Sequence, residues 1–99
     1  MIKNNINPRE MVASVGWEAN DGLLTDVYDF SDWDCPVESI SFKDAAKQVI
    51  DYAKEMSASD DDIVELQDAL IELGFKYKTG HKFFVYGIET DLCVGVVKE

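Results

Sequence analysis

Two successive segments whose apolar residues recur at helical spacing constrain the possible folds of this chain most. In the first, residues 42–56, the apolar side chains recur every three or four positions, as on one face of a helix. Ser41 precedes this segment and Asp44 follows three residues later, a pattern typical of a helix start. The expected apolar face consists of Ala45, Ala46, Val49, Ile50, Tyr52, Ala53 and Met56.

The second helical segment follows after a very short polar break. Ser57 or Ser59 can cap it. Gly74 is expected to end it in the left-handed conformation, with Phe75 as the hydrophobic residue beyond the end. Its expected apolar stripe consists of Ile63, Val64, Leu66, Leu70, Ile71 and Leu73.

The rest of the chain favours strands. Residues 75–78, 82–89 and 92–97 are rich in aromatic and β-branched side chains, and Thr79-Gly80 and Thr90-Asp91 can form the turns between them. These segments predict a C-terminal three-stranded antiparallel meander. Upstream, the turn signal Asn20-Asp21-Gly22 precedes an expected strand at 23–30, and a further short strand is expected at 37–41.

The N-terminal segment allows two interpretations. Asn7-Pro8-Arg9-Glu10 indicates a helix start, because Asn7 can cap and Pro8 suits the first helical position. A short helix would then present Met11, Val12 and Val15 on its apolar face and end near Gly16. The alternative is a strand through residues 11–17.

Taken together, these elements predict an α+β fold, with two or three helices packed on one face of a small antiparallel sheet. The length of 99 residues fits a single domain over residues 1–99. A winged-helix-like fold has a similar order of elements and is the structural alternative.

The charge balance limits the function more than any motif. Twenty acids against nine bases give a formal net charge of -11. Such a chain repels nucleic acid and anionic membranes and is attracted to basic surfaces. The polar N-terminus and the lack of a long apolar run predict a cytoplasmic protein with reduced cysteines and no membrane role. Cys35 and the edge strands leave a homodimer open.

The acids are concentrated in two segments without any lysine or arginine: residues 10–42, and residues 60–72 within the second helix. Four acids of that helix are spaced by four, three and four residues, which places them on one face. Within the first segment, aromatic and acidic residues alternate between positions 26 and 34 and resemble a protein-binding hot spot. The candidate partner-binding residues are therefore Asp26, Tyr28, Asp29, Asp32, Trp33, Asp34, Asp61, Glu65, Asp68 and Glu72. The alternative is that these acids only keep the protein soluble and that the aromatic residues belong to the core.

Catalytic and metal-binding patterns are weak. His81 is the only histidine, and Cys35 and Cys93 do not show the paired spacing of a zinc site. The six glycines are scattered, so no phosphate-binding loop is expected. We therefore expect no enzyme activity, no metal and no cofactor.

The function expected from these features is that of an acidic inhibitor or regulator. Its carboxylates would take the place of phosphates in the basic site of a nucleic-acid-binding protein. In size and charge alone, the chain resembles the small acidic phage proteins that block restriction, CRISPR or nucleoid proteins, and the immunity proteins that block toxin nucleases. The alternative function is a general protein-interaction module or small subunit whose acidity serves solubility.

Overall fold

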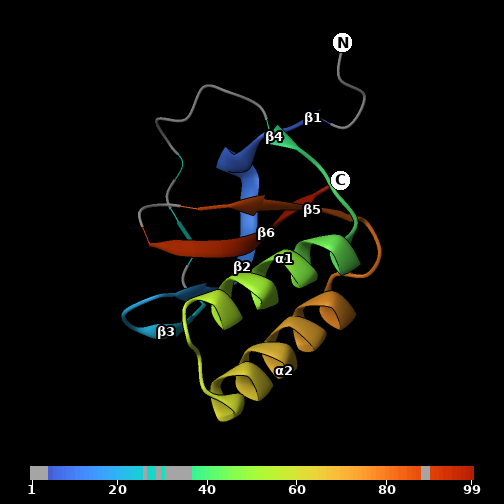
Figure 1. Cartoon of the computed structure of the whole chain (residues 1–99). Helices are drawn as coiled ribbons and strands as arrows, with labels where there is room; N and C mark the ends of the chain where they lie inside the picture. The colour runs from blue at the N-terminus through green and yellow to red at the C-terminus, as the bar shows by residue number, and fades with distance from the viewer. Residues whose placement is uncertain (1–4, 26, 29, 31–36, 88–89) are drawn as a thin grey trace.

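A computed structural model describes residues 5–25, 27, 28, 30, 37–87 and 90–99 of the chain. Two helices, α1 (Phe42–Glu55) and α2 (Asp60–Lys76), lie side by side on one face of a four-stranded antiparallel sheet (Figure 1). The strands follow the order β3-β2-β6-β5. Their bounds are Gly22–Leu24 for β3, Met11–Glu18 for β2, Asp91–Lys98 for β6 and His81–Tyr86 for β5. The predicted α+β fold is confirmed, and the winged-helix alternative is not.

Both faces of the sheet are covered. Because side chains alternate between the two faces of a strand, neighbouring residues of one strand enter two different cores. The face toward the helices carries Val15, Trp17, Phe83, Val94 and Val96, which share a core with Leu66 and Leu70 of α2. The opposite face carries Phe84 and Val97, which form a second, smaller core with Ile6 and Phe30. A two-stranded ladder of β1 (Asn5–Ile6) and β4 (Val37–Glu38) adjoins this second core.

The prediction of an N-terminal helix from Asn7 onward is wrong beyond the first turn. Asn7 does cap, since its side chain accepts a hydrogen bond from the Arg9 N–H at 3.0 Å, but only a 3-10 turn, η1 (Pro8–Glu10), follows. From Met11 the chain runs as β2 and pairs with β6 along almost its whole length. This long ladder, with Val15 and Trp17 in the core, outweighs the local helix signal. The strand alternative was therefore correct.

The two central helices begin where the sequence predicts. Ser41 caps α1 and Ser59 caps α2, each by accepting the backbone N–H three residues later, at 3.1 and 3.2 Å. The turn at Asn20-Asp21-Gly22 is also confirmed, and Gly22 has the positive φ of 91° that the turn needs. The following strand is shorter than the expected 23–30 and ends at Leu24. The expected strand at 37–41 is reduced to β4 and a bridge from Ile40 to Phe83.

The end of α2 was predicted wrongly. The helix continues through Gly74 and ends at Lys76, so residues 75–78 do not form the expected first strand of the meander. The central strand β6 instead pairs with β5 on one side and with β2 on the other. Gly74 serves close packing, because a Cβ atom there would lie 2.5 Å from Cε2 of Phe42 on α1.

Replacing Gly74 by alanine tests this role. Alanine is the better helix former by about 1 kcal/mol, yet we expect Gly74→Ala to lower the free energy of unfolding by about 1–3 kcal/mol through the clash with Phe42. The Phe42 ring has little freedom to move away, since it packs against Phe83 with ring centroids 5.1 Å apart. Urea denaturation measures the effect.

The matched control is the pair Phe42→Ala and Phe42→Ala/Gly74→Ala. With the ring removed, Gly74→Ala should become neutral or stabilising. A single Gly74→Ala variant that is more stable than the wild type would show that Gly74 is not needed for helix packing.

Candidate functional site

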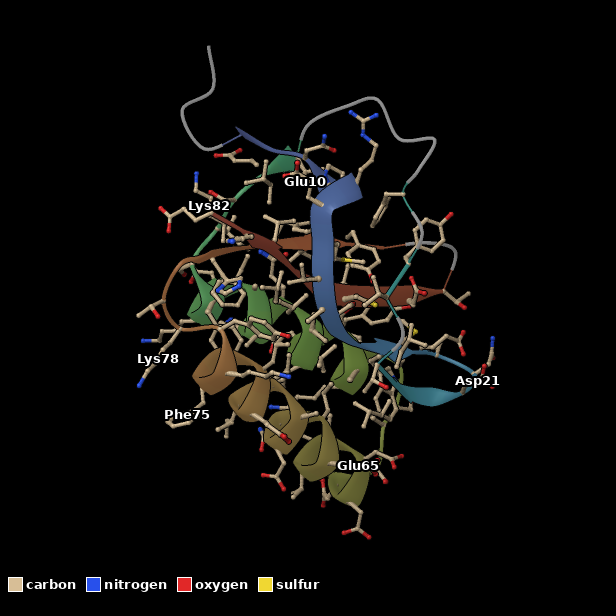
Figure 2. The ribbon with its side chains drawn as sticks, turned by 180° about the vertical axis from the view of Figure 1, so that it is seen from behind. Glu10, Asp21, Glu65, Phe75, Lys78 and Lys82 are labelled. Atoms are coloured by element: carbon tan, nitrogen blue, oxygen red, sulfur yellow. The ribbon has the colours of Figure 1, made fainter. Side chains whose placement is uncertain are left out.

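The acid row predicted on the second helix lies on the outer surface of α2. Asp61, Glu65, Asp68 and Glu72 are all exposed, because α2 buries the opposite side of the helix against the sheet and α1. Figure 2 shows Glu65 pointing away from the body of the protein. The buried side consists of Ile63, Leu66, Leu70 and Leu73. The spacing of four, three and four therefore gives one continuous acidic strip, which we call the acid row.

No lysine neutralises the acid row within the part of the chain that the structure describes. The one ion pair found there joins Lys47 and Asp51 on α1, at 3.0 Å. The lysines nearest in sequence lie at the C-terminal end of α2, where the Lys78 ammonium sits over the Phe75 ring at 4.8 Å from its centroid. The negative charge of the row is thus available to a partner.

A hollow of about 430 Å³ adjoins the N-terminal end of the acid row. The turn between β2 and β3 contributes Asp21 to its wall, and α2 contributes Asp62 and Glu65. The Glu18 carboxylate fixes that turn by accepting the backbone N–H groups of Asn20 and Asp21 at 2.9 and 2.6 Å. Sequence reasoning missed this convergence, since about forty residues separate the turn from α2 and no local pattern links them.

Glu18 itself is engaged within the protein. The hydrogen bond from the Thr90 hydroxyl, joined by those from the turn, lowers the pKa of the Glu18 carboxyl below its ordinary value. This carboxylate therefore supports the turn rather than facing a partner, and Asp21 is the acid of the turn that remains exposed.

The aromatic and acidic segment predicted as a second binding region lies largely outside the described residues: Asp26, Asp29, Asp32, Trp33 and Asp34. Tyr28 is described and is 46 % exposed. Its ring contacts that of Phe30 at 4.7 Å between centroids and lies 6.5 Å from that of Tyr86. Because Phe30 and Tyr86 belong to the core on the far side of the sheet, Tyr28 does not join the acid row.

The structure also separates the groups that nucleophilic chemistry would need. Cys93 is paired with Tyr86 in the sheet and His81 with Lys98, so the cysteine and the histidine lie about 17 Å apart along the strands. Burial raises the pKa of the Cys93 thiol to about 11, which keeps it protonated and a poor nucleophile. Cys35 lies outside the described residues.

The described part of the chain contains neither a cluster of metal ligands nor a helix that could cross a membrane. No group of three or more histidine, cysteine or acidic side chains there is placed to hold a metal ion. None of the described helices has both the length and the apolar character to cross a membrane.

The outer surface of α2 also carries large apolar side chains that sequence reasoning misplaced. Val64 and Ile71 were expected in the apolar stripe that faces the core, and Phe75 at the start of a strand. All three are exposed, by 55, 66 and 73 % respectively. The helical wheel contained the signal, because Val64 and Ile71 lie about 100° from their buried neighbours Ile63 and Leu70.

The acid row should lower the stability of the free protein. Like charges three or four residues apart in a helix destabilise it by about 0.2–0.5 kcal/mol per pair. We expect Glu65→Gln/Asp68→Asn to raise the midpoint of thermal unfolding in low salt, and the gain to shrink as salt screens the wild-type row. Circular dichroism melts at low and high salt measure both effects. A double variant that is less stable than the wild type in low salt would show that the row has favourable partners within the protein.

None of the protein families, curated proteins or solved structures compared with the chain matches it.

Proposed function

We propose that this protein is a non-enzymatic, acidic binding protein of the cytoplasm. It occupies a basic site on a nucleic-acid-binding protein and thereby inhibits or regulates that protein. The observation that carries the proposal is the acid row: four exposed carboxylates on one side of α2, with no ion pair among the described residues. Such a row offers lysine and arginine side chains the contacts that they otherwise make with phosphates.

The acid row is a line of like charges, as a phosphate strand is, but its charges are farther apart along the axis. From Asp61 to Glu72 the helix rises about 16 Å, so the four charges lie about 5.5 Å apart along the axis. The phosphates of one DNA strand follow each other at about 3.4 Å along the duplex axis. The row is thus sparser than a phosphate strand, and Asp60, Asp62 and Asp21 add charge at its N-terminal end.

The sign of the surface opposes direct nucleic-acid binding. A protein that binds nucleic acid neutralises phosphates with lysine and arginine, whereas α2 carries six acids and one lysine. The lysines at its C-terminal end, Lys76 and Lys78, lie over aromatic rings of their own chain and do not extend along the row. The partner that fits α2 is therefore a basic protein.

Displacement of labelled duplex DNA tests the proposal. The probes are purified basic DNA-binding proteins of four classes: a restriction nuclease, a CRISPR effector, a nucleoid protein and a toxin nuclease. We expect the wild type to displace the duplex from at least one of them, and the effect to weaken between about 50 and 300 mM salt. Asp61→Asn/Glu65→Gln/Asp68→Asn/Glu72→Gln should weaken displacement by more than about fourfold, and by about 60-fold at the middle of the range, since four exposed ion pairs contribute about 0.2–1 kcal/mol each.

The matched control removes the same number of charges elsewhere. Glu10, Glu38, Glu55 and Glu99 are exposed and lie outside α2, so Glu10→Gln/Glu38→Gln/Glu55→Gln/Glu99→Gln should stay within about threefold of the wild type, the effect of ~0.7 kcal/mol. Equal losses in the two variants would show that net charge acts rather than the row. No displacement of any probe at low salt would contradict the proposal.

A further inference from the structure

Three large apolar side chains share the outer surface of α2 with the acid row. Val64, Ile71 and Phe75 are separated by seven and four residues, so they fall on one line along the helix. We call this line the apolar strip. Figure 2 shows Phe75 at the C-terminal end of α2, directed away from the sheet. The strip therefore faces solvent over about 16 Å, or three helical turns.

The fold does not require the apolar strip. The buried side of α2 consists of Ile63, Leu66, Leu70 and Leu73, and it lies opposite the strip. The strip contributes nothing to either core, although its members are among the most exposed large apolar residues of the described chain. Large apolar side chains that are exposed in a row beside charged residues are typical of an interaction site.

Phosphate mimicry alone does not explain the strip either. Carboxylates would suffice to occupy the contacts of a phosphate backbone, and a valine, an isoleucine and a phenylalanine beside them add apolar surface that must be covered. The Phe75 ring already accepts the Lys78 ammonium at 4.8 Å, which shows that a cation fits against the strip. The occupant therefore combines apolar and cationic groups.

Charge complementarity decides what the occupant is. The acid row runs along one side of the strip, and its Asp68 lies nearest to the strip, at a height between Val64 and Ile71 along the axis. A second copy of this chain would bring two acid rows together, between molecules that each carry a net charge of -11. A basic segment instead neutralises the row while its apolar residues cover the strip.

We infer that the outer surface of α2 docks a basic amphipathic helix of the partner. The helix has an apolar seam of at least three turns, which packs against Val64, Ile71 and Phe75. Lysine or arginine residues beside the seam pair with the acid row. This inference rests on the proposed function, because it specifies which part of a basic protein the acid row binds.

Three basic probes of about 20 residues test the inference. The first is a peptide of leucine, lysine and alanine with leucines at helical spacing and lysines along one side of them. The second is a scrambled peptide of the same composition without that pattern, and the third is polylysine. Binding to the wild type is measured by fluorescence anisotropy in low salt. We expect the patterned peptide to bind at least about tenfold more tightly than the scrambled one, because only its leucines can cover the strip together.

Protein variants assign that preference to the strip. Val64→Ser/Ile71→Ser/Phe75→Ser should lose the preference for the patterned peptide and keep the wild-type affinity for polylysine. The control Val12→Thr/Val27→Thr changes exposed apolar residues outside α2 and should behave like the wild type. Far-UV circular dichroism confirms that each variant is folded, as expected for exposed positions.

The outcomes separate the two proposals. Equal affinity for the patterned and scrambled peptides, with polylysine bound through the acid row, overturns this inference and leaves the proposed function standing. Failure of all three probes to bind in low salt overturns both. A wild-type dimer by light scattering that becomes a monomer in the serine variant shows that a second copy covers the strip, which also overturns the inference.

Discussion

The burial of Leu66 and Leu70 against the sheet and α1 fixes the rotation of α2, and the properties of the surface follow from that rotation. Both leucines are almost completely buried, in a core that includes Val94 and Val96 of the central strand β6. A helix held in this orientation turns Asp61, Glu65, Asp68 and Glu72 outward whatever charge they carry. The same rotation exposes Val64, Ile71 and Phe75. Acidic and apolar surfaces are thus two consequences of one packing arrangement.

The exposed sides of the two helices differ in their charge. On α1, lysines and acids alternate along the exposed side, and Lys47 pairs with Asp51. In contrast, α2 contains six acids and one lysine, and within the described residues no carboxylate of the acid row forms an ion pair. A helix of mixed sign would be more stable, since neighbouring like charges oppose helix formation. The neighbouring helix shows that this fold accommodates mixed charge, so the unmixed row points to a function of the surface.

Local signals predicted the parts of the fold that depend on local interactions. The serine caps of both helices, the extent of α1 and the turn at Gly22 could be recognised because each depends on a few neighbouring residues. The N-terminal strand and the end of α2 could not. Residues 11–18 form a strand because β6 pairs with them from across the chain, and Gly74 continues the helix because Phe42 packs against it. Both features depend on partners more than thirty residues away.

The candidate site also combines features that depend on neighbouring residues with features that depend on distant parts of the chain. Helical spacing was enough to place the four acids on one exposed surface, and the structure agrees. The spacing did not show that Asp21 approaches the N-terminal end of the row, nor that Tyr28 belongs to the other side of the sheet. The exposed strip could have been recognised from the helical wheel, but apolar residues beside a buried stripe are easily assigned to the core. The charge pattern therefore predicted that these acids share one exposed surface, and only the packing revealed the apolar side chains beside them.

Chemical-shift mapping shows whether the outer surface of α2 is the surface that binds a basic partner. A ¹⁵N-labelled sample is titrated with a basic amphipathic peptide, and the shift of each backbone amide is followed. We expect the largest changes at residues 60–76, those of α2, with smaller changes at the turn around Asp21. Changes spread evenly over the molecule, or centred on the sheet face that Phe84 and Tyr86 occupy, would contradict this expectation.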